Sequence, residues 1–94
     1  MTSAATVERI FVVKSELGLH ARPAGRFVAL AGGFESDVEV ARGDEWVSGK
    51  SVLSLLSLAA GAGTELRIRA VGEDAKSAVE ALGRLLEEPE VAGA

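Results

Sequence analysis

The sequence predicts a single α+β domain, an open-faced β-sandwich in which three helices lie on one face of a four-stranded antiparallel sheet. The chain has 94 residues, which is too few for two domains, and 48% of them are hydrophobic, which is enough to form one core. Hydrophobic residues alternate or cluster in four short segments and recur with helical spacing in three others. These segments follow in the order β-α-β-β-α-β-α, which is typical of a layer of helices on an antiparallel sheet.

The first strand is expected over Val7–Lys14, because Ile10–Val13 are β-branched or aromatic residues. A loop around Gly18 follows, and Ala21–Ala31 is expected to be a helix. Its apolar residues share one helical face: Ala24, Phe27, Val28 and Ala31. Pro23 lies in the first turn, where the missing backbone donor costs little.

A hairpin is expected next. Val38 and Val40 alternate with polar residues in Asp37–Ala41, which predicts a strand. Arg42–Asp44 is expected to form the turn, and Glu45–Ser48 the second strand. Trp46 in that strand is expected to pack at the edge of the sheet.

The second half of the chain predicts helix, strand and helix. Ser51–Leu58 is leucine-rich and begins with a residue that caps helices well, so we expect a short helix there. Glu65–Val71 alternates apolar residues with arginines, which predicts a half-exposed strand. A last helix is expected between a cap at Asp74 and Pro89. Its apolar residues again share one face: Ala75, Ala78, Val79, Leu82, Leu85 and Leu86.

Composition excludes several classes of function. The net charge of −4 argues against a general nucleic-acid or anionic-lipid surface. Without cysteine, the chain has no disulfide, no thiolate zinc site and no cysteine nucleophile. The longest uncharged run, Ser51–Thr64, is too short and polar to insert in a membrane, and Met1–Val13 lacks a secretory signal. We therefore expect a cytoplasmic protein with one domain over residues 1–94, a core at about 8–88, and frayed ends at Met1–Thr6 and Val91–Ala94.

His20 is the one histidine of the chain and precedes the first predicted helix. The first turn of a helix offers unpaired backbone N–H groups and a partial positive charge, which together favour a bound anion. Arg22 adds a guanidinium, which matches a phosphate well. An imidazole beside such a site is suited to accept a phosphoryl group. On position alone, a helix cap, a surface histidine or a buried structural histidine are the alternatives, and a metal site lacks sufficient ligands.

The segment Gly18-Leu19-His20-Ala21-Arg22-Pro23-Ala24 resembles the active-site motif of the HPr family, the histidine phosphocarriers of the bacterial phosphoenolpyruvate-dependent phosphotransferase system. The resemblance extends to Gly49-Lys50-Ser51, the leucine-rich segment after it and the last amphipathic helix, over about residues 8–88. Two separated motifs at matching spacing are more specific than one.

The resemblance implies a role for each matching residue. His20 corresponds to the histidine that is phosphorylated on Nδ1, and Arg22 to the arginine that stabilises the phosphoryl group. The backbone amides of Ala21 and Arg22 are expected to bind phosphate oxygens. Ser51 corresponds to a serine that a kinase/phosphorylase modifies in many relatives. The partner-docking patch corresponds to three residues of the second helix: Val52, Leu53 and Leu56.

The resemblance also implies the partners. Enzyme I would phosphorylate His20, IIA-type proteins would accept the phosphoryl group, and HPr kinase/phosphorylase would act on Ser51. No cofactor, metal or nucleic acid is expected, and the protein is expected to be a monomer and a carrier rather than an enzyme with its own small substrate. Two alternatives remain: a nitrogen-branch carrier that acts on a regulatory IIA protein, and an unphosphorylated interaction domain that uses the patch.

Overall fold

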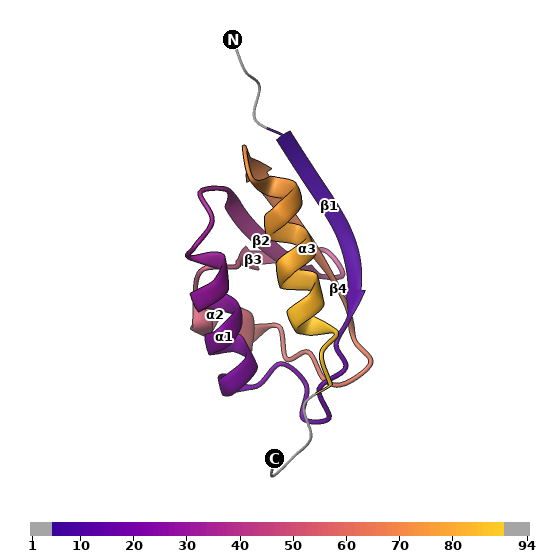
Figure 1. Ribbon diagram of the computed structural model, residues 1–94. Helices are drawn as coiled ribbons and strands as arrows, with labels where there is room; N and C mark the ends of the chain where they lie inside the picture. The colour runs from indigo at the N-terminus through magenta and orange to yellow at the C-terminus, as the bar shows by residue number, and fades with distance from the viewer. Residues whose placement is uncertain (1–4, 90–94) are drawn as a thin grey trace.

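The computed structural model describes residues 5–89, and its elements follow the predicted order (Figure 1). The strands are β1 (Ala5–Val12), β2 (Asp37–Arg42), β3 (Glu45–Ser48) and β4 (Glu65–Gly72), and the helices are α1 (Ala21–Ala31), α2 (Val52–Ser57) and α3 (Ala75–Leu86). The predicted frayed ends at residues 1–4 and 91–94 lie outside the described residues.

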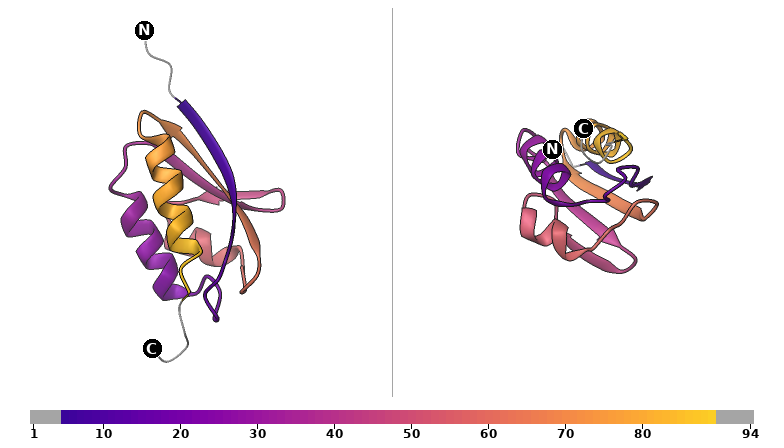
Figure 2. Two further views of the ribbon diagram at one scale, coloured as in Figure 1. Left: turned by 45° about the vertical axis from the view of Figure 1, so that its right-hand side comes forward. Right: turned by 90° about the horizontal axis from the view of Figure 1, so that it is seen from below.

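The four strands form one antiparallel sheet in the order β1-β4-β2-β3. The helices lie on one side of this sheet and leave its other face uncovered (Figure 2). This arrangement confirms the predicted open-faced sandwich. The first helix and the short strand β3 have the bounds that the sequence predicted.

The predicted bounds of the first strand were wrong at both ends. Ala5 and Thr6 belong to β1 rather than to a frayed end, because β4 continues to Gly72 and supplies pairing partners for both. Val13 and Lys14 lie beyond the strand. Val13 instead exchanges backbone hydrogen bonds with the Gly63–Thr64 loop, at 2.8 and 2.9 Å, so the chain bends there toward the start of α1.

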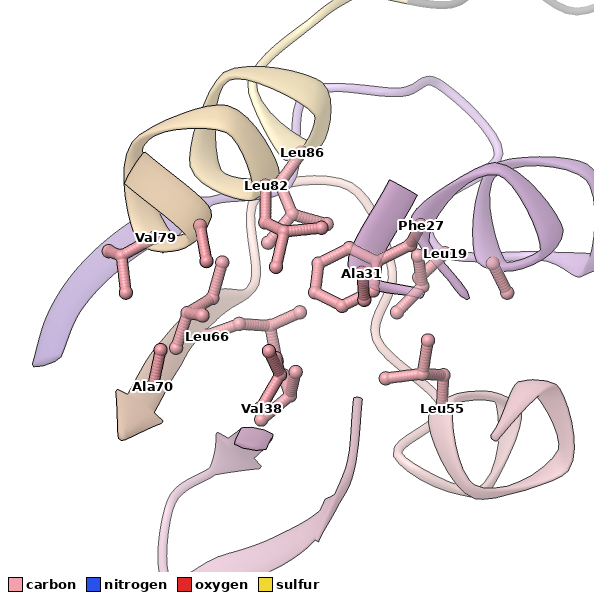
Figure 3. Packing of buried hydrophobic residues seen from close by; sticks show 14 of the residues in the cluster. Leu19, Phe27, Ala31, Val38, Leu55, Leu66, Ala70, Val79, Leu82 and Leu86 are labelled. Atoms are coloured by element: carbon pink, nitrogen blue, oxygen red, sulfur yellow. The ribbon is translucent and has the colours of Figure 1, made fainter. Parts of the chain in front are cut away.

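The core lies between the helices and the sheet. Phe27 points from α1 into this layer, with Leu82 of α3 on one side and Leu55 of α2 on another (Figure 3). All three side chains are fully buried, as is Leu66 on β4. Burial of such side chains is the main stabilising contribution to a domain that has few aromatic residues.

Asp74 precedes α3 as predicted, but its side chain does not cap that helix. Its carboxylate accepts hydrogen bonds from the Glu35 amide at 2.9 Å, and from the Ser36 amide and hydroxyl at 3.0 and 2.5 Å. These bonds, the Ser36 hydroxyl first, lower the pKa of Asp74. The carboxylate therefore joins the start of α3 to the loop after α1, which sequence spacing could not reveal.

On the uncovered face of the sheet, two arginines stack on a tryptophan ring. The guanidinium groups of Arg69 and Arg67 lie over the Trp46 ring, 4.0 and 4.9 Å from its centroid. Arg69 donates to Glu39 at 2.7 Å, and Arg67 lies 3.6 Å from a carboxylate oxygen of Glu8. The arginines thus face outward as predicted, and Trp46 packs under them on β3, an edge strand of the sheet, as expected.

Candidate functional site

His20 occupies the N-cap position of α1, at the end of the molecule where the β1–α1 loop meets the helix (Figure 1). Its backbone is extended, and its carbonyl accepts the first helical hydrogen bond from the Ala24 amide at 3.0 Å. The imidazole is half-buried and does not cap the helix. The side chain is therefore held at the start of α1 without filling the position that a capping oxygen would take.

Two backbone donors remain open at the start of α1. The first N–H groups of a helix have no acceptor within the helix. Here Ala21 and Arg22 occupy the first two positions, Pro23 has no N–H, and the Ala24 amide is already bonded to His20. The open donors next to His20 are thus those of Ala21 and Arg22, the pair that the sequence indicated, and both residues are exposed.

Arg22 supplies a positive charge at the same place. Its side chain is exposed, and no carboxylate among residues 5–89 forms an ion pair with it. Arg26, one turn further along α1, is instead bound to Glu88 at 3.0 Å. Of these two arginines on α1, Arg22 is the one that can turn its guanidinium toward an anion at His20.

A glycine fixes the loop that leads to His20. Gly18 has a φ of +75°, and a Cβ atom there would lie 2.5 Å from the Ala60 carbonyl oxygen. That same oxygen accepts the Leu19 amide at 2.8 Å. The loop before His20 is therefore held against Ala60, in the segment that follows α2.

Ser51 caps α2, as the sequence indicated. Its hydroxyl accepts a hydrogen bond from the Ser54 amide at 3.2 Å. Ser51 as a residue is half-buried, and Lys50 beside it is exposed. Ser51 therefore has a structural role as the cap of α2.

The three residues of the expected patch differ in exposure. Leu53 is 80% exposed, while Val52 and Leu56 are half-buried and pack against the core. Leu55 and Leu58 on the same segment are buried. The helix therefore presents one fully projecting leucine between two partly covered apolar residues.

A small cavity lies behind the β1–α1 loop that leads to His20. The cavity behind the β1–α1 loop, lined in part by Ser15, Leu19 and Pro23, has a volume of about 10 Å³. That volume is about one water molecule. Within residues 5–89, the structure contains no cluster of three or more residues suited to bind a metal ion. None of the helices in that range has the length and hydrophobicity to traverse a lipid bilayer.

Two residues that shape this site, Arg42 and Leu17, carry no role in the sequence motifs. Arg42 donates to the Leu58 and Ala59 carbonyls at 3.0 and 2.9 Å and so caps the C-terminal end of α2. Leu17 projects from the loop before His20 with 59% of its surface exposed. Leu17 could have been noticed in the sequence, because it is an apolar residue in a predicted loop next to the motif. The Arg42 contact could not, because it depends on the tertiary fold.

Comparisons with known proteins agree on one family. The sequence model described as "PTS HPr component phosphorylation site" matches residues 7–88. Phosphocarrier protein HPr of Haloferax volcanii is 42% identical over 86 residues, which cover 89% of this chain and 97% of that protein.

Solved structures agree as well. The crystal structure of HPr from Bacillus anthracis superposes with a TM-score of 0.84 at 36% identity, and the match covers 87% of this chain and 98% of that one. Crh of Bacillus subtilis, described as a dimer with a swapped domain, superposes with a TM-score of 0.71 at 42% identity, over 77% of this chain and 83% of that one.

Proposed function

Because this chain belongs to the HPr family of the phosphotransferase system, we propose that it carries a phosphoryl group on His20 between enzyme I and IIA-type acceptor proteins. One observation carries the proposal. The imidazole of His20 lies at the start of α1, beside the open amides of Ala21 and Arg22. A phosphoryl group on this ring would meet two hydrogen-bond donors, the positive end of the helix dipole and the Arg22 guanidinium.

The transfer is a simple exchange of one bond for another. A nitrogen of the neutral His20 ring, Nδ1 by the family resemblance, attacks the phosphorus of a phosphohistidine on enzyme I. The new N–P bond forms while the bond to the donor histidine breaks, and the donor ring leaves as neutral imidazole. Nothing is oxidised or reduced. The same exchange in the opposite sense passes the phosphoryl group to an acceptor histidine, so alignment and charge stabilisation are the main requirements.

The donors around His20 would bind the phosphoryl group with moderate strength, which suits a phosphoryl group that must leave again. Two amide donors and a helix terminus contribute about 1–3 kcal/mol to the bound phosphoryl group. Arg22 is exposed, so water screens its charge and moderates its contribution. The phosphohistidine would be stable enough to diffuse between proteins and reactive enough to be discharged.

Partner docking in this proposal uses Leu53, with Val52 and Leu56 beside it. Leu53 is 80% exposed, and exposed leucines contribute to binding when a partner covers them. The segment after α2 contacts the loop before His20 through Ala60, which supports one continuous surface. A partner seated there, in the cytoplasm, would meet both the apolar patch and the reacting histidine.

Ser51 is proposed as a regulatory site for HPr kinase/phosphorylase. Ser51 is half-buried and stands at the start of α2, where the helix tolerates a phosphate. The added charge would lie beside Val52 and Leu53 and would oppose docking of acidic partners. The monomer expected from the sequence stays a prediction, since a relative forms a swapped dimer.

Incubation with phosphoenolpyruvate and enzyme I tests the central step. Intact mass should show one added phosphoryl group that is lost in acid, and the His20→Ala variant should show none. Arg22→Gln, which keeps the histidine, should be phosphorylated more slowly. An acid-stable label, or equal labelling of the His20→Ala variant, would refute His20 as the carrier residue.

A further inference from the structure

Leu17 is an exposed apolar residue that neither the core nor the proposed patch accounts for. It is 59% exposed at the tip of the turn before His20. The residues on either side of the tip, Ser15 and Gly18, are buried, and the Gly18 amide donates to the Ser15 carbonyl at 3.0 Å. The turn thus directs Leu17 outward while its base is fixed.

The base of this turn has little freedom to move. The Leu19 amide is bonded to Ala60, and Gly18 lies too close to Ala60 and Gly61 for a side chain. Leu19 itself is 5% exposed and belongs to the core. The position of Leu17 relative to His20 is therefore set by the fold.

A partner protein that reaches His20 is large enough to cover Leu17 as well. Leu17 lies three positions before His20 in the chain, so their Cα atoms lie at most about 11 Å apart. Even a small transient complex buries about 600 Å² on each partner, which corresponds to a disc with a radius of about 14 Å. A protein that brings its own histidine to His20 consequently covers the surface around Leu17.

We propose that Leu17 is a docking residue for the proteins that exchange a phosphoryl group with His20, and that these partners present an apolar recess next to their reactive histidine. The proposal rests on the proposed function and adds a contact outside α2. Leu17 would add to the patch of Leu53 a second apolar contact, on the loop that leads to His20.

Ile10 offers a matched control. It is also 59% exposed, but it lies on β1 and faces the uncovered side of the sheet beside Arg67. Leu17→Ser and Ile10→Ser remove the same kind of exposed apolar surface from opposite sides of the molecule. The measurement is the initial rate of phosphoryl transfer from phosphorylated enzyme I as a function of carrier concentration.

We expect Leu17→Ser to raise KM about tenfold with little change in kcat, because the partner no longer buries the leucine. Ile10→Ser should leave KM unchanged, and Leu17→Met should restore it. Circular dichroism checks that each variant is folded, and Leu17→Lys replaces Leu17→Ser if the latter melts early. Equal KM values for the Leu17 and Ile10 variants, with a wild type that is phosphorylated, would overturn this proposal alone. A wild type that accepts no phosphoryl group would overturn the proposed function as well.

Discussion

Gly18 lies against the carbonyl oxygen of Ala60 so closely that no side chain fits between them. A Cβ atom on Gly18 would be 2.5 Å from that oxygen, and the glycine has a φ of +75°. Both features require glycine. The contact joins the loop that carries His20 to the segment after α2, so the position of His20 depends on how these two loops pack.

Replacement of Gly18 should therefore disturb both the fold and the transfer. Gly18→Ala is expected to lower the free energy of unfolding by about 2–4 kcal/mol, through backbone strain and contact with the Ala60 carbonyl. Phosphoryl transfer should slow because His20 moves. Urea unfolding and the transfer rate measure the two effects.

Gly61→Ala is the matched control for this prediction. Gly61 lies in the adjacent loop, and a Cβ atom there would meet nothing within 4 Å. Its stability should change by less than about 1 kcal/mol. If Gly18→Ala and Gly61→Ala were equally stable and equally active, the contact with Ala60 would not position His20.

The carboxylate of Asp74 should make stability depend on pH. Hydrogen bonds from the Ser36 hydroxyl and the Glu35 amide lower its pKa in the folded protein. The folded pKa thus lies below the unfolded value of 3.8. The stabilisation is complete well above that value and is lost as the pH falls through the folded pKa.

Asp74→Asn tests this pH dependence. We expect the variant to be less stable than the wild type at pH 7, and the difference in free energy of unfolding to shrink below about pH 4. Asp44→Asn, in the exposed β2–β3 turn, is the control. A difference between wild type and Asp74→Asn that stays constant from pH 7 to pH 3 would contradict the role of the charge.

Fold and site were predictable from sequence to different extents. Apolar spacing was sufficient for α1, because Ala24, Phe27 and Ala31 are buried on the predicted face. The end of β1 was not predictable, because Val13 leaves the strand to bond Thr64, a residue distant in the sequence. The cap expected at Asp74 was wrong for a similar reason: its carboxylate bonds the loop after α1 instead of its own helix.

Within the candidate site, one short motif was enough to indicate His20 and Arg22, because they lie only two positions apart in the chain. Local spacing also predicted Ser51 as a cap. The contact of Gly18 with Ala60 was beyond sequence reasoning, since it depends on how two loops meet. The exposure of Leu17 likewise follows from the direction of a turn, which the sequence did not determine.

A charge at Ser51 should weaken docking without unfolding α2. Ser51→Asp and Ser51→Asn both provide a capping oxygen for the Ser54 amide, so both should remain folded. The aspartate alone adds a negative charge beside Leu53, and it should raise KM for enzyme I at least about tenfold. Because both variants keep a capping oxygen, a difference in KM between them measures the effect of the negative charge alone. Identical KM values for the two variants would exclude the regulatory proposal.

Trp46 should contribute to stability but not to transfer. It lies under Arg67 and Arg69 on the uncovered face of the sheet, on the opposite side from the helices. Trp46→Ala should lower the free energy of unfolding by about 1–2 kcal/mol, and Trp46→Phe by less because a ring face remains. Unchanged transfer rates in both variants are expected. A slower transfer at full folding would indicate that partners contact this face.

The most direct test of the carrier role is a chase experiment that follows the phosphoryl group from His20 to an acceptor protein. The phosphorylated protein is purified from enzyme I and phosphoenolpyruvate, mixed with a IIA-type acceptor, and both proteins are followed by intact mass. We predict that the phosphoryl group leaves His20 and appears on the acceptor in equal amount, so that this chain returns to its original mass. A phosphoryl group that stays on the chain, or that is released to water without reaching the acceptor, would contradict the account.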